Sequence, residues 1–369
     1  MMIDIRLKDL MNEKGIDAVI AVSPENVLYT SGVDIFTQKL VRDRLAFTVF
    51  SAKSEPTMIV CNIEEGLTRE ESSIQDIRTY VEFKESPISK LVEVLKEKGL
   101  TNAVIAIETE FLAMEFAKEL EKDLPNIKIT KAEPLFNYVR VYKSKEEVEL
   151  LKYAASSTTN VIEEVFQEAN IGDTEKEIAI KMNNRMIEKG GNPVYTVLGS
   201  GYRSTNLHAE PTEKKINSGE VMRTDFSGLF KGYYSDVART VFVGTPSARQ
   251  EMILTSLFDI HKKLIQSAKV GVKFSELYNY CVELFKEKNL AFSLPHIGHS
   301  IGVVLHEEPI IHPFNERKLE EGMVLNVEPL CVDEETESGY HVEDLIHITK
   351  DGPELLTCDT LREYPIIVK

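Results

Sequence analysis

The sequence has little that marks a secreted, membrane-spanning or nucleic-acid-binding protein. No apolar run is long enough to span a bilayer, and residues 1–15 form an amphipathic pattern rather than a signal peptide. With 43 basic against 60 acidic residues and a formal net charge of −17, the chain contains no basic cluster for phosphate binding. Its four cysteines are widely spaced, without a C-x-x-C motif: Cys61, Cys281, Cys331 and Cys358. We therefore expect a cytoplasmic protein with unpaired thiols that binds neither membranes nor nucleic acids.

Length and composition predict two folded domains. The 369 residues exceed one average domain, and 43% hydrophobic with 28% charged residues is typical of a globular protein. Helical and strand-like segments alternate in residues 1–135, which favours an α/β fold. We expect strands at 17–22, 46–51, 58–61 and 103–107, and helices at 86–98 and 112–124.

A second domain is expected to span residues 136–369. Ser144 and Glu147 form the S-x-x-E pattern of a capping box that opens a long helix, and Thr174 and Glu177 repeat it. Further helices are expected near 247–268 and 275–288. Strand-rich stretches lie between these helices, and every candidate ligand falls in or beside them.

Residues 221–244 contain two runs of β-branched and aromatic residues joined near Lys231, a pattern that predicts a β-hairpin. With an even loop at that point, Ser227 faces Asp236 across the hairpin. Asp225 then becomes the diagonal neighbour of Asp236 on the same face. The two carboxylates would converge, whereas an odd loop length would separate them.

Residues 322–349 repeat this arrangement around an acidic turn. Glu328 and Glu343 are symmetric about its middle, so an antiparallel pairing places them opposite one another, with Cβ atoms about 5 Å apart. Pro329 cannot donate a hydrogen bond to a ladder, which predicts a bulge or a strand edge beside Glu328.

Between the two hairpins, His299 and His306 flank a glycine-containing stretch within residues 296–309. Any one of these acids or histidines alone would most often be a turn, surface or core residue. Four converging carboxylates, however, would repel one another unless cations lay among them. Two divalent ions and one imidazole would complete such a site. Oxygen-rich ligation with one nitrogen favours manganese or cobalt, with iron and zinc as alternatives.

The order of these motifs resembles that of the pita-bread metallopeptidases, the family of aminopeptidase P, prolidase, methionine aminopeptidase and the metal-free creatinase. The matching segments are DFSGLFKGYYSDVARTV, GHSIGVVLHEEP, EEGMVLNVEP and GYHVEDLIHIT. The N-terminal half resembles the creatinase-type domain that precedes the catalytic domain in aminopeptidase P and prolidase. The resemblance implies an α+β pita-bread domain with pseudo-twofold halves of helices and antiparallel sheet.

The resemblance also implies a ligand set. Asp236 and Glu343 would bridge two ions, and Asp225 would chelate one of them. His299 and Glu328 would bind the other ion. The nucleophile would be a bridging water present as hydroxide, whose proton Glu328 accepts and passes on.

Two further histidines match the family's substrate contacts. His306 and His208 would donate a hydrogen bond to the scissile carbonyl or its developing oxyanion. For His208, the residues alone leave an exposed loop histidine as an equal alternative.

The chain departs from the family at two positions near the substrate. Members often have glycine after the E-P pair and an arginine just before the last V/I-E-D, whereas here Leu330 follows Pro329 and His341 stands two residues before Glu343. We expect His341 to contact the substrate. The missing guanidinium weakens the expectation that a free carboxylate is bound, as a dipeptide-specific prolidase requires.

These features predict an Xaa-Pro peptidase that acts on dipeptides or short peptides. A hydrolase of a small non-peptide amide or amidine is an alternative on the same fold, and a non-catalytic binding or regulatory protein is another. By analogy with the family, we expect a homodimer.

Overall fold

The computed structural model describes residues 2–357 and 367–369, so Cys358 lies outside the described residues. The chain forms two compact units, Met1–Arg140 and Val141–Lys369. The boundary expected between residues 135 and 136 falls inside helix α7 (Glu133–Val141). Within the described part of the chain, every helix is too short or too polar to cross a bilayer.

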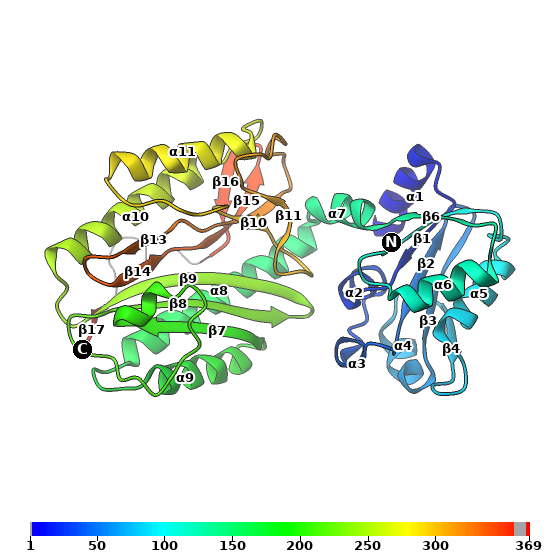
Figure 1. Cartoon of the computed structure of the whole chain (residues 1–369), viewed down its shortest axis with the longest axis horizontal. Coiled ribbons are helices and arrows are strands. Elements are labelled where there is room, and N and C mark those ends of the chain that lie inside the picture. Colours follow the sequence, from blue (N-terminus) through cyan, green and yellow to red (C-terminus); the bar gives the residue numbers. More distant parts are fainter. Residues whose placement is uncertain (1, 358–366) are drawn as a thin grey trace. The chain divides into compact units, whose positions relative to one another are not determined.

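The N-terminal unit is built on a mixed six-stranded sheet with the order β4-β3-β2-β1-β5-β6 (Figure 1). Only the β1–β2 and β2–β3 pairs of this sheet are antiparallel. The strands are β1 (Ala18–Ala21), β2 (Phe47–Ser51), β3 (Ser54–Cys61), β4 (Asp76–Tyr80), β5 (Val104–Ile107) and β6 (Lys128–Lys131). The other helices are α1 (Met2–Lys14), α2 (Pro24–Ser31), α3 (Phe36–Leu40), η1 (Asn62–Glu64), α4 (Glu65–Glu71), α5 (Pro87–Glu97) and α6 (Met114–Asp123).

Strand β1 is buried on both faces of this sheet, because helices cover each side. Ile20 belongs to the core that includes α5 and α6, whereas Val19 belongs to the core that includes α1 and α7. A continuous apolar run is what a strand buried on both faces requires. The α/β expectation for this unit is confirmed.

The C-terminal unit begins with a half made of two helices and a four-stranded sheet that is antiparallel except for the pair β17–β9. The strands β7 (Asn192–Ser200), β8 (Val221–Phe230) and β9 (Tyr233–Val243) pair in sequence, and β17 (Ile367–Val368) joins β9. Helices α8 (Lys145–Glu168) and α9 (Glu175–Glu188) pack on this sheet through a shared apolar core. Both predicted capping boxes are present, at Ser144 with Glu147 and at Thr174 with Glu177. A short helix, η2 (Gly201–Thr205), follows β7.

The second half repeats this plan with α10 (Ala248–Ser267) and α11 (Phe274–Glu287), whose apolar faces share a core with the strands beneath them (Figure 1). Five strands form the larger sheet, in the order β11 (Glu307–Ile310), β10 (His299–Ser300), β12 (Val324–Val327), β15 (Asp344–Thr349) and β16 (Gly352–Leu355). Strands β13 (Leu330–Asp333) and β14 (Ser338–His341) form a separate ladder. The expected architecture, two similar halves of helices and antiparallel strands, is confirmed.

Candidate metal centre

The first pair of acids comes from the β8–β9 hairpin. Lys231 and Gly232 form its two-residue turn, with φ values of 48° and 82°. Positive φ at both positions is typical of the type I′ turn, whose twist matches that of the flanking strands. The predicted register is confirmed, because Ser227 pairs with Asp236. Asp225 therefore lies diagonally across from Asp236 on one face.

The second pair of acids lies at a junction between two ladders. Pro329 separates β12 from β13, as expected of a residue that cannot donate to a ladder. Glu328 and Glu343 occupy this gap, and the ladders on either side keep one register, with Val327 opposite Asp344 and Leu330 opposite His341.

In this gap the backbone amides of both glutamates bond to other parts of the unit. Glu328 donates its N–H to the carbonyl oxygen of Ile297, at 3.0 Å, next to the histidine segment. Glu343 donates its N–H to the carbonyl oxygen of Ala238 on β9, at 3.1 Å. These two hydrogen bonds attach the second acidic pair to the strands that carry Asp236 and His299.

The five predicted ligands come together in space. Two overlapping groups have ligand atoms within 4.8 Å of one another, namely Asp225, Asp236 and Glu343, and His299, Glu328 and Glu343. Glu343 belongs to both groups, so two neighbouring ions, one in each group, would share its carboxylate.

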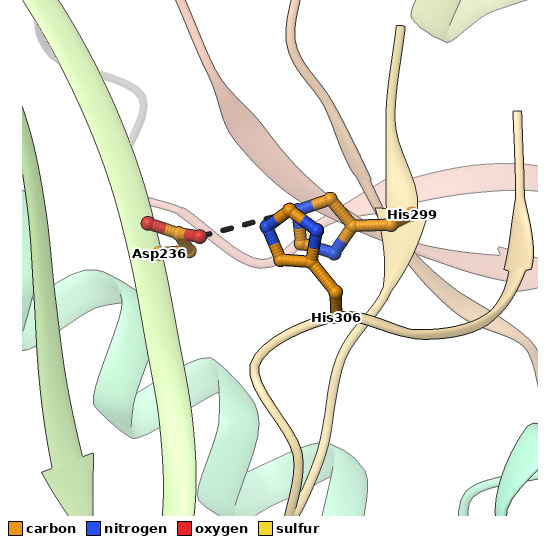
Figure 2. Close-up of side chains that lie close together, drawn as sticks. All are labelled: Asp236, His299 and His306. Carbon is orange, nitrogen blue, oxygen red and sulfur yellow. Dashed lines mark ion pairs between the residues drawn. The ribbon is translucent and has the colours of Figure 1, made fainter. Parts of the chain in front are cut away.

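A third group joins Asp236, His299 and His306 (Figure 2). The Nε2 atom of His299 lies 3.9 Å from a carboxylate oxygen of Asp236. The ring of His306 stacks on that of His299, with 3.8 Å between centroids and 19° between planes. His306 thus lies close enough to count either as a substrate contact or as an additional ligand.

The site's electrostatics fit divalent cations. Burial, followed by repulsion from neighbouring carboxylates, raises the pKa of both Asp236 and Glu343 well above the usual range. The His299 Nε2 and Glu343 Oε1 atoms are buried and lack a hydrogen-bond partner among the described residues. Buried polar atoms of this kind are rare unless a ligand or an ion satisfies them. An oxygen-rich set with one imidazole is a donor set that such ions accept.

Glu328 differs from Asp236 and Glu343 in that its pKa is lowered, so it stays ionised. Burial would raise its pKa, but the imidazoles of His296 and His341 beside it outweigh burial and lower the pKa. His296 Nδ1 lies 3.3 Å from Glu328 Oε1, and the nearness of this carboxylate raises the pKa of His296. Sequence reasoning missed His296, although it precedes His299 by three residues in the same segment.

Tyr195 on β7 is a second residue that sequence reasoning missed. Its hydroxyl lies 2.9 Å from Asp225 Oδ1 and 2.6 Å from Asp236 Oδ1, so it can donate to either carboxylate. Burial raises the pKa of the phenol strongly, which keeps it a donor. Only the β7–β8 pairing, which connects separate segments of the chain, brings it to the acids.

The three predicted substrate contacts line one cavity of about 760 Å³ beside the acids. His208 is exposed in the loop after η2, so it is a loop histidine and also part of the cavity wall. Partial burial, and then the neighbouring His299, lowers the pKa of His306 to about 4, which keeps its ring neutral. His341 is buried, with Nε2 lying 3.7 Å from Glu328 Oε2.

Two similar halves that enclose four acids and several histidines beside a cavity define a metal-dependent hydrolase. The sequence profile of metallopeptidase family M24 matches residues 149–350, and that of the creatinase/prolidase N-terminal domain matches residues 5–142. The chain belongs to metallopeptidase family M24, which confirms the resemblance, and is a metallopeptidase. Membership of this family, together with the clusters of acids and histidines, indicates divalent metal ions.

Relatives match along nearly the whole chain. The Xaa-Pro dipeptidase of Pyrococcus horikoshii is 29% identical over 357 residues, covering 95% of each chain. The crystal structure of the prolidase from that organism superposes with a TM-score of 0.84 at 27% identity, covering 98% of this chain and 100% of the other. A dipeptidase structure from the same organism superposes with a TM-score of 0.88 at 25% identity, covering 100% of both chains.

Proposed function

We propose that this metallopeptidase hydrolyses the amide bond before proline in dipeptides or short peptides. One observation carries the proposal: five side chains of the required types converge in a chain similar to an Xaa-Pro dipeptidase along 95% of its length. The five proposed ligands of two divalent ions are Asp225, Asp236, His299, Glu328 and Glu343.

The proposed roles follow from the charge state of each side chain. The bound ions would supply Lewis acidity and lower the pKa of a coordinated water. Glu328, whose carboxylate lies beside His296 and His341, accepts the proton at a carboxylate oxygen. His306 donates from its neutral ring to the scissile carbonyl oxygen. His208 reaches the same cavity from the loop after η2 and serves as a second contact to the substrate.

The cavity wall supports a substrate with a proline ring. Apolar side chains form part of the lining, among them Val194, Leu294, Pro295, Leu305 and Leu330. Of the described lining residues, Arg223 is the one that carries a permanent positive charge. Its guanidinium already donates to three backbone carbonyl oxygens of residues 204–207, so a free C-terminal carboxylate would rely on histidines and on metal for recognition.

We further propose manganese or cobalt as the ions, with zinc and iron as alternatives, because the donor set is rich in oxygen. The homodimer remains an expectation from the family. A cytoplasmic location agrees with three cysteines that are buried and unpaired: Cys61, Cys281 and Cys331.

A substrate panel tests the proposal. Protein stripped with a chelator and reloaded with Mn²⁺, Co²⁺, Zn²⁺ or Fe²⁺ is assayed on Xaa-Pro, Xaa-Pro-Xaa and matched Xaa-Ala peptides. We expect turnover of the proline peptides that is lost on stripping and restored by manganese or cobalt. Equal rates with alanine peptides would overturn the proline preference. Activity confined to small amides or amidines, or metal binding without turnover, would favour the two alternative functions.

A further inference from the structure

A second cavity adjoins the catalytic one within the C-terminal unit. Its volume is about 1120 Å³, against about 760 Å³ for the cavity beside the acids. Four apolar residues line both cavities: Leu207, Leu294, Pro295 and Leu330. The two cavities are therefore neighbours, and a peptide longer than the first cavity would extend into the second.

Strand β13 contributes one wall of the second cavity along its edge. All four of its residues, Leu330–Asp333, line the cavity, although the side chains of a strand alternate between its two faces. A cavity over one face would be lined by every second residue. The cavity therefore follows the edge of the strand, where backbone groups are presented.

The pairing of β13 with β14 shows which backbone groups point to that edge. In an antiparallel ladder, alternate pairs of residues direct their N–H and C=O groups away from the partner strand. Gly339 belongs to such a pair, because its N–H donates outside the ladder to the hydroxyl of Ser204, at 2.8 Å, and the N–H of His341 likewise donates to a hydroxyl outside the ladder. Their partners on β13 are Val332 and Leu330. The N–H and C=O groups of these two residues therefore point away from β14.

These four backbone groups are available to a ligand. None of them hydrogen-bonds to a residue that the structure describes, and β13 pairs with β14 alone among the described strands. Unpaired groups at a strand edge are a template for pairing with another extended chain. Such pairing binds the backbone of the added chain, so it accepts substrates of varied sequence.

We propose that the edge of β13 binds the part of a peptide substrate that follows the proline, as an added β-strand in the second cavity. Val332 lies four residues after the proposed ligand Glu328, or about 13 Å along an extended chain. The proline and the three residues after it would span this distance. The inference rests on the proposed peptidase function, and it adds peptides of about five residues to the dipeptides as substrates.

Ester analogues of one peptide test the pairing without altering the protein. In Xaa-Pro-Ala-Ala-Ala, each amide after the proline is replaced in turn by an ester, which removes one N–H donor. Alternate residues of a paired strand face its partner, so the ester should lower kcat/KM of the metal-loaded enzyme about 5- to 10-fold at alternate positions and have little effect in between. Equal values for the amide peptide and all its ester analogues would overturn the proposal.

A proline in β13 tests the same hydrogen bonds from the side of the protein. Val332→Pro removes an N–H at the free edge, where proline is tolerated, and the neighbouring residues keep their hydrogen bonds to β14. Val332→Ala is the matched control, because it shortens the side chain and keeps the N–H. Relative to this control, Val332→Pro should lower kcat/KM for the pentapeptide about 5- to 10-fold and leave that for Xaa-Pro unchanged.

Two results with these variants would contradict the pairing. One is equal kcat/KM of Val332→Pro and Val332→Ala for the pentapeptide, and the other is an equal loss for the pentapeptide and the dipeptide. The ester series uses the parent protein, so it decides the matter even if Val332→Pro does not fold.

Calorimetric binding separates this proposal from the proposed function. The metal-loaded parent is titrated with Xaa-Pro-Ala-Ala-Ala in which a methylene replaces the scissile carbonyl, and with its ester analogues. We expect the loss of affinity to alternate along the peptide. A parent that shows this alternation but hydrolyses no proline peptide would count against the peptidase function alone. A parent that hydrolyses Xaa-Pro and binds the amide and ester peptides equally would overturn the strand pairing alone.

Discussion

At the scale of single residues, burial makes the acidic cluster depend on cations. Asp236 and Glu343 are 2% and 1% exposed, so their charged forms lose most of their hydration. Without metal, each acid resists ionisation and its pKa is raised. Near neutral pH, the metal-free folded state therefore still binds protons on these carboxyl groups, whereas the unfolded chain has already released them.

The first prediction concerns the pH dependence of the metal-free protein. A raised carboxyl pKa means that the folded state binds more protons than the unfolded state, so stability falls as pH rises above the usual carboxyl value. Asp236→Asn removes that titration without changing the shape. We expect metal-free Asp236→Asn to unfold at higher urea concentration than the metal-free parent at pH 8. The gain should exceed about 1 kcal/mol, roughly one unit of pKa, and should shrink towards pH 5.

Denaturation midpoints measured across this pH range check the prediction. Equal midpoints for parent and variant at pH 8 would mean that burial does not raise the pKa of Asp236. In the presence of metal, the parent should have the higher midpoint, because the amide of Asp236→Asn is a poorer ligand than the carboxylate.

The second prediction concerns the two acids proposed to bridge the ions. Asp236→Ala and Glu343→Ala should each lose both metal ions and all turnover, since each removes an oxygen donor shared by the two sites. Metal analysis after purification without chelator, together with an Xaa-Pro assay, checks this. Full turnover in either variant would refute the bridging role.

The third prediction concerns His208 and His306. Replacing either with alanine should leave the metal content intact and lower kcat, because each is proposed to contact the substrate. The stacking of His306 on His299 makes metal analysis decisive here. If His306→Ala loses an ion, the group of Asp236, His299 and His306 is a ligand set and our role for His306 is wrong.

At the scale of secondary-structure elements, a close approach between the backbones of β14 and η2 holds the loop that carries His208. Gly339 on β14 donates its N–H to the hydroxyl of Ser204, at 2.8 Å. A Cβ atom at Gly339 would lie 2.1 Å from the carbonyl oxygen of Ser204. That oxygen also accepts from Arg223, so β14, η2 and β8 meet at one point.

The fourth prediction follows from this contact. Gly339→Ala should destabilise the fold by about 1–3 kcal/mol through overpacking. It should also lower kcat/KM, because the loop with His208 would shift. Gly66 in α4 has open space around it, so Gly66→Ala is the matched control and should be neutral or stabilising. Unchanged stability and activity in Gly339→Ala would contradict the role of this contact.

Local patterns predicted the elements that carry the acids. Both hairpin registers followed from residues symmetric about a turn, and Pro329 predicted the break beside Glu328. The long helices and their capping boxes were predictable for the same reason. In contrast, α2, α3 and α4 are only 8, 5 and 7 residues long, too short for periodicity to reveal.

Residues that reach the site across distant segments could not be predicted in this way. Tyr195 approaches the acids only through the pairing of β7 with β8. Arg223 and Asp225 lie on the same face of β8, so the alternation of side chains along the strand placed Arg223 near the acids. Its partners, however, are carbonyl groups of a loop whose path depends on tertiary packing.

At the scale of the whole molecule, the fifth prediction concerns assembly. The N-terminal unit exposes Phe36, Leu40 and Val41 in and directly after α3, apolar side chains of the kind that a partner subunit covers. We expect a homodimer, with a mass by light scattering of twice the 41.8 kDa of one chain. A monomeric mass at all concentrations would contradict the expectation without affecting the metal centre.

The central claim is that two ions lie among Asp225, Asp236, His299, Glu328 and Glu343. Anomalous diffraction from crystals grown with manganese tests it most directly. We predict two peaks about 3.5–4 Å apart, with the carboxylates of Asp236 and Glu343 between them. The absence of peaks, or peaks that these five side chains do not contact, would contradict the account.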